Sequence, residues 1–198
     1  MSAFAKKQEK INEIILITEC EDGSPYIAPF GVRERGDLIL IAPFKPSTSL
    51  NNLLSGRRTT INTTDDVGVF AGTLTGRRDW AVNKTQSAFI LESALSYKVL
   101  SLEKVEEDEQ RPNLYFRVLD EQNLKPFQGY NRAQAAVLEL CVLVSRLHML
   151  PMEKITSEIE YLRIAIEKTA SDHELEAWGW LIEAVENHRA TLSGSHFA

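Results

Sequence analysis

Three short apolar segments near the start of the chain, joined by glycine-containing turns, constrain the fold most. They cover residues 12–20, 24–33 and 38–42, and the turns between them are Glu21-Asp22-Gly23 and Arg35-Gly36-Asp37. No helical pattern separates these segments, so they predict an antiparallel meander and not a parallel sheet with crossover helices. Pro25 and Pro29 cannot donate a ladder hydrogen bond, which indicates an edge or a bulge in the second strand.

The meander leads into a turn that is rich in proline and hydroxyl side chains. Ser47 and Thr48 are both suitable N-caps for a short helix predicted over 50–54. The free amides of a first helical turn attract an anion, and Lys45 adds a full positive charge beside them. A phosphate therefore fits this segment, although an ordinary capped helix is the commoner explanation of a cap and a lysine taken alone.

The second half of the chain changes from strand to helix patterns near Pro126. Before it, strands are predicted over 57–62, 67–70, 94–105 and 114–119, with a long polar loop over 72–86. A helix over 92–102 is the alternative to the strand over 94–105. After it, apolar spacing predicts helices over 131–149, 152–169 and 171–189, the last opened by a Ser171–Glu174 capping box. Gly179 weakens that last helix and could mark close packing. The expected fold is α+β, with a β-rich part over 1–125 and a C-terminal three-helix segment over 126–198.

Charge and hydropathy narrow the class of protein. The 198-residue chain carries a net charge of -6, which argues against a protein that binds the nucleic acid backbone. No stretch approaches the roughly 20 apolar residues of a membrane span, and the N-terminus has no signal-peptide core. The two cysteines, Cys20 and Cys141, are expected to be free thiols in a reducing cytoplasm. A cytoplasmic location without membrane association is the resulting expectation.

Several blocks in a fixed order carry a family resemblance. They are Ile17-Thr18-Glu19, Ser24 to Val32, Pro43 to Thr48, Asn51-Asn52-Leu53, Ile61 to Val67 with Phe70, Asn131-Arg132-Ala133, Ser145-Arg146-Leu147, Tyr161-Leu162-Arg163 and Glu167-Lys168-Thr169. Together they resemble the FMN-binding split-barrel proteins, the group that includes flavin reductases and pyridoxamine-phosphate-oxidase-like enzymes. Within that group, the chain is most similar to a little-characterised family with an N-terminal split barrel and a C-terminal helical segment. The resemblance implies an antiparallel split β-barrel.

The resemblance also implies a set of FMN-binding residues. The phosphate would be held by Lys45, Ser47 and Thr48, with Asn51 or Asn52 adding amide hydrogen bonds. Residues along the ring or the ribityl chain would be Pro29, Phe30, Gly31, Asn62 and Thr63, and a bulged edge strand is the alternative for the first three. Arg146 falls in the apolar helix predicted over 131–149, where an unpaired charge is costly. Arg146 should therefore pair with a carboxylate or reach a bound anion, and this group could belong to a partner subunit.

The remaining polar residues give weaker signals. Asp65 and Asp66 are neighbours, so on a strand they would point to opposite faces, and a turn is favoured over a metal site. The four histidines show no ligand spacing, and no metal is inferred. Arg77 and Arg78 could grip a phosphate of a second substrate such as a nicotinamide or pterin cofactor, although a solvated arginine pair is the commoner case.

Three functional hypotheses follow. The leading one is a homodimeric FMN flavoprotein, an oxidoreductase of flavin-reductase type that acts on an unidentified small molecule. No catalytic residue is assigned, because the flavin itself would carry the redox chemistry. The alternatives are a non-enzymatic FMN carrier or sensor and a flavin-free dimeric interaction module.

Overall fold

The computed structural model describes residues 9–77 and 79–194, which form two compact units. The barrel unit contains Met1–Thr63, Val82–Glu92 and Ser96–Leu124. The helical unit contains Thr64–Ala81, Ser93–Leu95 and Lys125–Ala198. The helical unit therefore draws on segments inside the β-rich part of the sequence as well as on the C-terminal residues.

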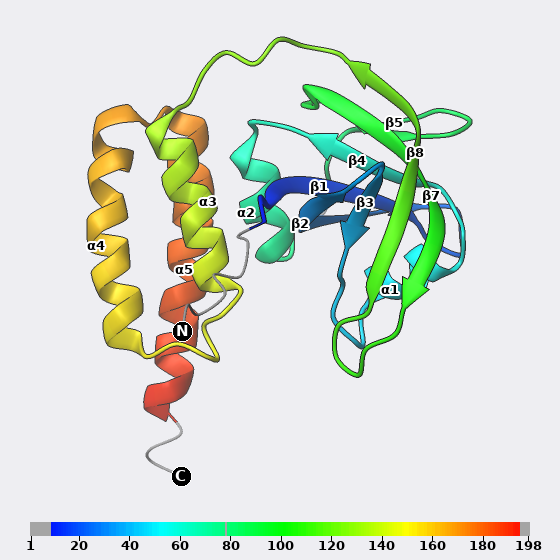
Figure 1. Cartoon of the computed structure of the whole chain (residues 1–198). Coiled ribbons are helices and arrows are strands. Elements are labelled where there is room, and N and C mark those ends of the chain that lie inside the picture. The colour runs from blue at the N-terminus through cyan, green and yellow to red at the C-terminus, as the bar shows by residue number, and fades with distance from the viewer. Residues whose placement is uncertain (1–8, 78, 195–198) are drawn as a thin grey trace, which may run out of the picture. The chain divides into compact units, whose positions relative to one another are not determined.

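Six strands close the barrel unit into an antiparallel barrel (Figure 1). They are β1 (Asn12–Glu19), β2 (Pro25–Arg35), β3 (Leu38–Ile41), β4 (Thr59–Thr63), β7 (Ser96–Glu106) and β8 (Asn113–Asn123). Their order around the barrel is β1-β2-β3-β8-β7-β4, and β4 pairs back with β1. The short helix α1 (Thr48–Leu54) joins β3 to β4, while β5 (Val82–Lys84) and β6 (Phe89–Leu91) form a separate two-stranded sheet. The predicted meander and the predicted α+β class are confirmed.

The barrel interior is filled by alternate strand residues together with one face of α1. Ile14 and Leu16 of β1 point into the same cluster as Phe116 of β8, and Leu50 and Leu53 of α1 complete it. These side chains are all at most 5% exposed, so each contributes roughly 1.5–3 kcal/mol of transfer free energy. This packing fixes α1, and with it the turn that precedes α1, against the barrel.

The hairpin of β7 and β8 is long, and two register shifts interrupt it. They lie between Val99 and Leu100 and between Leu102 and Lys104. Such bulges increase the local twist and redirect side chains. The turn of this hairpin, residues 107–112, matters for the candidate site described below.

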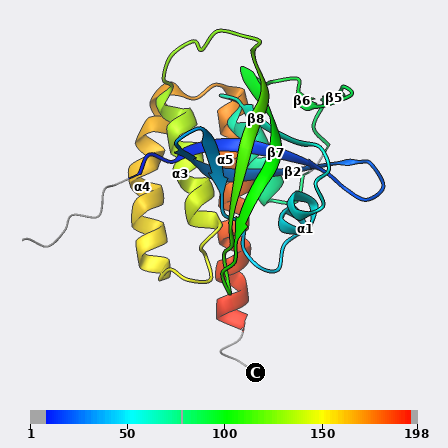
Figure 2. The ribbon, with the colours of Figure 1, turned by 45° about the vertical axis from the view of Figure 1, so that its right-hand side comes forward.

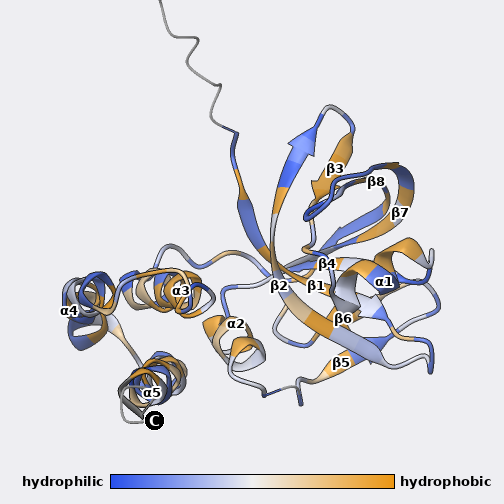
Figure 3. Ribbon diagram, turned by 90° about the horizontal axis from the view of Figure 1, so that it is seen from below, coloured by the Kyte–Doolittle hydropathy of each residue, from blue (hydrophilic) through white to orange (hydrophobic). Residues whose placement is uncertain are grey.

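The helical unit contains α2 (Val67–Leu74), α3 (Arg132–Val144), α4 (Met152–Thr169) and α5 (Asp172–Gly194). α3 and α4 lie side by side and run in opposite directions in Figures 1 and 2. Figure 3 shows both hydrophobic and hydrophilic residues on α4, as expected for a helix with one buried face. The predicted capping box is confirmed, because Glu174 Oε2 accepts hydrogen bonds from Ser171 N (2.9 Å) and Ser171 Oγ (2.6 Å). Within the described residues, no helix has the length and apolar character needed to cross a bilayer.

Three local predictions in the helical unit were wrong. Residues 67–70 are the first turn of α2 and not a strand, because the Asp66 carboxylate accepts from Gly68 N (3.0 Å) and caps a helix. α3 ends at Val144 and not at residue 149, and Ser145 Oγ bonds the carbonyl oxygen of Val142 there (2.8 Å). Gly179 does not mark close packing, since a β-carbon added to it would meet no atom within 4 Å.

Candidate functional site

The segment that follows β3 is tied to the β7–β8 turn. Lys45 Nζ donates to Glu107 Oε2 (2.8 Å) and to the carbonyl oxygen of Asp108 (2.9 Å). The backbone N–H of Lys45 donates to the carbonyl oxygen of Gln110 (2.8 Å). The predicted phosphate-binding lysine therefore has a defined position, and two chain segments far apart in sequence form its surroundings.

The two hydroxyl residues of the same segment lie at the start of α1. Ser47 is the N-cap, and its Oγ accepts a hydrogen bond from Leu50 N (3.2 Å), which confirms the predicted cap. Because Oγ acts there as the acceptor, its own proton stays available for donation. Thr48 is exposed and Ser47 is half-buried. A cation and two hydroxyls thus share one accessible turn.

Arg111 adds a second cation to this region, and no prediction from the sequence had identified it. Its Nε donates to the carbonyl oxygen of Ala42 (2.6 Å), and its guanidinium lies 4.6 Å from the centre of the Phe44 ring. The Asp108 carboxylate accepts from the backbone N–H groups of Arg111 (2.7 Å) and Gln110 (2.9 Å). These hydrogen bonds lower the pKa of Asp108, so this carboxylate holds the turn in place.

Most of the asparagine and threonine side chains predicted to contact FMN form hydrogen bonds within the barrel unit. Asn52 is buried, and its Nδ2 donates to Thr18 Oγ1 (3.0 Å), while Asn51 is exposed. Asn62 is fully buried, and its side-chain amide donates to the carbonyl oxygen of Phe89 (3.1 Å) and accepts from Leu91 N (3.0 Å). Thr63 Oγ1 shares a hydrogen bond with Ser96 Oγ (2.6 Å). The two hydrogen bonds of the Asn62 side chain therefore hold β6 against β4.

The predicted ring-contacting segment lies on β2. Phe30 packs against the barrel core, so its side chain points inward. At Gly31 an added β-carbon would stand 2.8 Å from Ile11 Cγ2, so the chain's own Ile11 occupies that space. Arg33 lies opposite Leu40 in the antiparallel pairing of β2 with β3, and the chain leaving β3 therefore runs toward the level of Gly31. Pro29 to Gly31 precede the paired residues of β2, and the Lys45 segment follows the paired residues of β3.

The structural premise for Arg146 was wrong. This residue lies in the turn after α3, where it is exposed, and not in an apolar helix. It therefore needs no buried partner.

Arg77 has partners within the helical unit. Its guanidinium lies 4.4 Å from the centre of the Trp180 ring, and its Nη1 donates to Thr75 Oγ1 (2.9 Å). Arg78 lies outside the described residues.

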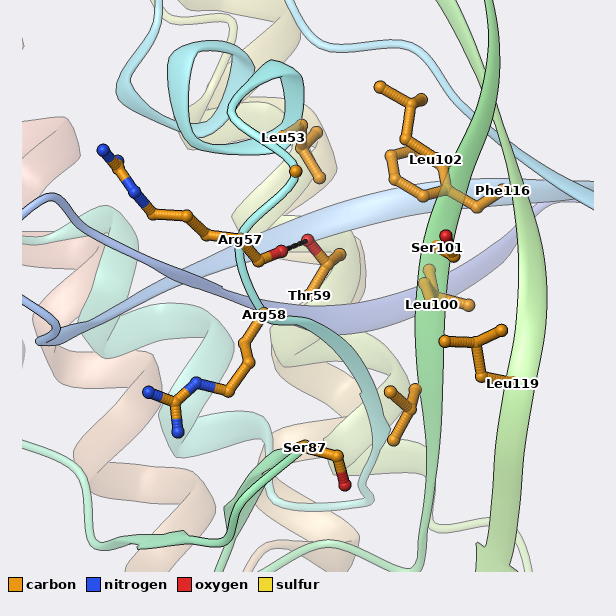
Figure 4. A pocket seen from close by; sticks show the side chains of 12 residues that line it. Leu53, Arg57, Arg58, Thr59, Ser87, Leu100, Ser101, Leu102, Phe116 and Leu119 are labelled. Carbon is orange, nitrogen blue, oxygen red and sulfur yellow. Dashed lines mark hydrogen bonds between the residues drawn. The ribbon is translucent and has the colours of Figure 1, made fainter.

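A separate pocket of about 280 Å³ opens beside the C-terminal end of α1 (Figure 4). Its walls include Leu53, Leu102 and Leu119, while the side chains of Arg57 and Arg58 point away from these walls in Figure 4. Arg58 pairs with Glu19 and lowers the pKa of that carboxyl. Neither Lys45 nor Thr48 lines this pocket. In the described residues, no group of three or more His, Cys, Asp or Glu side chains is placed to hold a metal ion.

Comparison with known families decides the classification. Residues 12–125 match the model for the N-terminal domain of a protein family of unknown function, DUF447, and residues 131–183 match a further DUF447 model. The chain belongs to the DUF447 family. Among curated proteins, none matches it.

Solved structures show that other proteins share this fold. The FMN-bound DUF447 protein MM1853 from Methanosarcina mazei has a TM-score of 0.75 at 24% identity, over 89% of this chain and 96% of that chain. An FMN-binding protein from Thermus thermophilus has a TM-score of 0.51 at 13% identity, covering 66% of this chain and 81% of its own. The styrene monooxygenase flavin reductase from Pseudomonas putida S12 has a TM-score of 0.50 at 14% identity, with coverages of 57% and 79%. The split-barrel fold expected for this DUF447 protein is confirmed.

Proposed function

We propose that this DUF447 protein binds FMN and holds the FMN phosphate on the segment Lys45–Thr48. The observation that carries the proposal is that one short accessible segment supplies the Lys45 ammonium together with the hydroxyls of Ser47 and Thr48 at the start of α1. An FMN-bound structure in the same family and an FMN-binding protein of similar fold support the choice of ligand.

The residues of this segment fit a phosphate group chemically. An ammonium has three N–H donors, and two of those on Lys45 already have acceptors, so one remains for an incoming oxygen. The Ser47 and Thr48 hydroxyls would donate to further phosphate oxygens. Hydrogen bonds between charged groups are about twice as strong as neutral ones, so Lys45 would contribute most. Arg111 would add favourable charge from the neighbouring turn.

We further propose a cytoplasmic, homodimeric oxidoreductase of flavin-reductase type. In such a protein the bound flavin supplies the redox chemistry, and the chain binds, orients and shields it. The electron donor would be a small molecule such as a nicotinamide or pterin cofactor. A non-enzymatic FMN carrier or sensor is the second candidate. Steady-state oxidation of NADH or NADPH by the FMN-loaded protein, well above the rate of free FMN, would favour the enzyme over the carrier.

A titration of flavin-free protein tests the binding site. FMN and riboflavin differ only by the phosphate, so their affinities should differ in wild type. The double variant Lys45→Ala/Thr48→Ala should bind FMN about 10- to 100-fold more weakly and riboflavin unchanged. Arg111→Ala should weaken FMN binding about 3- to 10-fold, and the control Arg57→Ala should leave it unchanged. Equal affinity for FMN in wild type and in the double variant would refute the phosphate site.

A further inference from the structure

A groove in the helical unit lies between α3 and α4. Its volume is about 350 Å³, and Arg132, Ala135 and Glu139 of α3 line it together with Tyr161 and Ile164 of α4. The side chains of Tyr161 and Ile164 are 72% and 44% exposed. Asn131 Nδ2 donates to the carbonyl oxygen of Thr169 (3.1 Å), which fixes the start of α3 beside the end of α4. The groove is thus a defined surface with an apolar rim.

The charges on this surface are arranged in a simple pattern. Arg132 and Glu139 are seven residues apart, which places them on one face of α3, about 10 Å apart along the axis. Both side chains are exposed, and neither forms an ion pair or side-chain hydrogen bond with another residue in the described part of the chain. Between them the exposed residue is Ala135, whose small side chain allows a second helix to approach closely, while Ala136 is buried.

This pattern is self-complementary under a two-fold rotation. An axis that passes between Ala135 and Ala136, perpendicular to α3, reverses the helix direction and exchanges the two charged ends. Arg132 would then face the partner's Glu139, and Glu139 would face the partner's Arg132. Two-fold interfaces use the same patch on both subunits in this reciprocal way. A small anion with an apolar body could bind in the groove beside Arg132. Such a ligand would give Glu139 no partner of opposite charge.

We propose that a second copy of this chain docks on the α3–α4 groove through antiparallel α3 helices. The two reciprocal Arg132–Glu139 contacts set the register, and Tyr161 and Ile164 are covered by the partner helix pair. Aromatic side chains at the centre of the patch with polar groups at its rim are typical of such interfaces. The proposal names a surface for the homodimer proposed above, and it does not depend on FMN binding.

Charge reversal tests the pairing by sedimentation equilibrium of the full chain. The single variants Arg132→Glu and Glu139→Arg each place like charges opposite each other at both reciprocal contacts. Each should therefore raise the dissociation constant of the assembly about tenfold or more. The double variant Arg132→Glu/Glu139→Arg recreates opposite charges at both contacts and should return to within about twofold of wild type. The control Glu176→Arg, an exposed charge on α5, should have no effect.

The outcomes separate this proposal from the proposed function. A monomeric wild type, singles that associate as wild type does, or a double variant as weak as the singles would each overturn the docking mode. FMN affinity is measured on the same four variants. Unchanged FMN affinity with altered association supports the docking surface alone, while loss of FMN binding in Lys45→Ala/Thr48→Ala leaves association unchanged. Circular dichroism of each variant confirms that the fold is retained.

Discussion

The ammonium of Lys45 lies 2.8 Å from the Glu107 carboxylate, and this contact joins the segment after β3 to the β7–β8 turn. The Glu107 side chain is 74% exposed, so its carboxylate can move into solvent at little cost. A phosphate arriving at Lys45 would compete with Glu107 for the same donor. The ion pair therefore orients the lysine and at the same time weakens the site for an anion.

The first prediction concerns this competition. Glu107→Gln removes the negative charge but keeps the size of the side chain, so FMN affinity should rise about 3- to 10-fold at low salt. The gain should shrink at high salt and be absent for riboflavin, which has no phosphate. Flavin fluorescence titration gives these affinities. Glu109→Gln, in the same turn, is the control. An FMN affinity that falls in Glu107→Gln would show that the carboxylate assists binding.

Local signals in the sequence predicted much of the fold. The Ser47 cap and the Ser171–Glu174 capping box depend on residues at most three positions apart, and both were found. The segment over 67–70 failed because its valines and phenylalanine favour a strand, whereas the Asp66 carboxylate caps a helix at Gly68. The capping hydrogen bond favours the helix over the strand, and composition alone did not separate these two states.

The surroundings of the candidate site could not be predicted in the same way. Glu107 lies 62 positions from Lys45, and Arg111 lies 69 positions from Ala42, whose carbonyl oxygen it binds. Only the barrel pairing of β3 with β8 brings the β7–β8 turn to the end of β3. The strands predicted over 94–105 and 114–119 leave a turn at this position, but the sequence gave no information on the neighbours of that turn. The family resemblance implied that Asn62 contacts the flavin. The structural role of its amide could not be predicted, because the β6 carbonyl oxygen that accepts from it belongs to Phe89, 27 residues away.

The second prediction concerns Asn62. Asn62→Ala leaves the buried carbonyl oxygen of Phe89 and the buried N–H of Leu91 without partners, which should lower the free energy of unfolding by about 2–4 kcal/mol. Urea unfolding measures this change. Asn51→Ala, at an exposed position, should change it by less than about 0.5 kcal/mol. If the folded Asn62→Ala variant also binds riboflavin much more weakly, Asn62 contacts the flavin in addition to its structural role.

The third prediction compares two helical glycines. A β-carbon at Gly72 of α2 would overlap Cζ2 of Trp80, so Gly72→Ala should destabilise the protein by about 1–3 kcal/mol. A β-carbon at Gly179 of α5 meets no atom within 4 Å, so Gly179→Ala should stabilise by about 0.4–1 kcal/mol. Thermal unfolding of the two variants should therefore shift in opposite directions. Equal shifts would contradict the packing of Trp80 against α2.

The fourth prediction concerns the buried thiol of Cys141. Burial raises the pKa of Cys141 from its ordinary value of 9.0 to about 12. The unfolded chain therefore loses this proton at lower pH than the folded chain, so the contribution to stability is complete below about pH 9 and is lost as pH rises toward about 12. Between about pH 7 and pH 10, wild type should lose about 1.4 kcal/mol more than Cys141→Ala.

Urea unfolding of both proteins at the two pH values, under reducing conditions, measures this difference. Titration of the other groups is common to the two proteins and cancels in the comparison. The cavity left by Cys141→Ala lowers stability by the same amount at both pH values, so it cancels as well. An equal loss in wild type and variant would mean that the thiolate of Cys141 is accommodated in the folded state, and hence that α3 is open to water at this position.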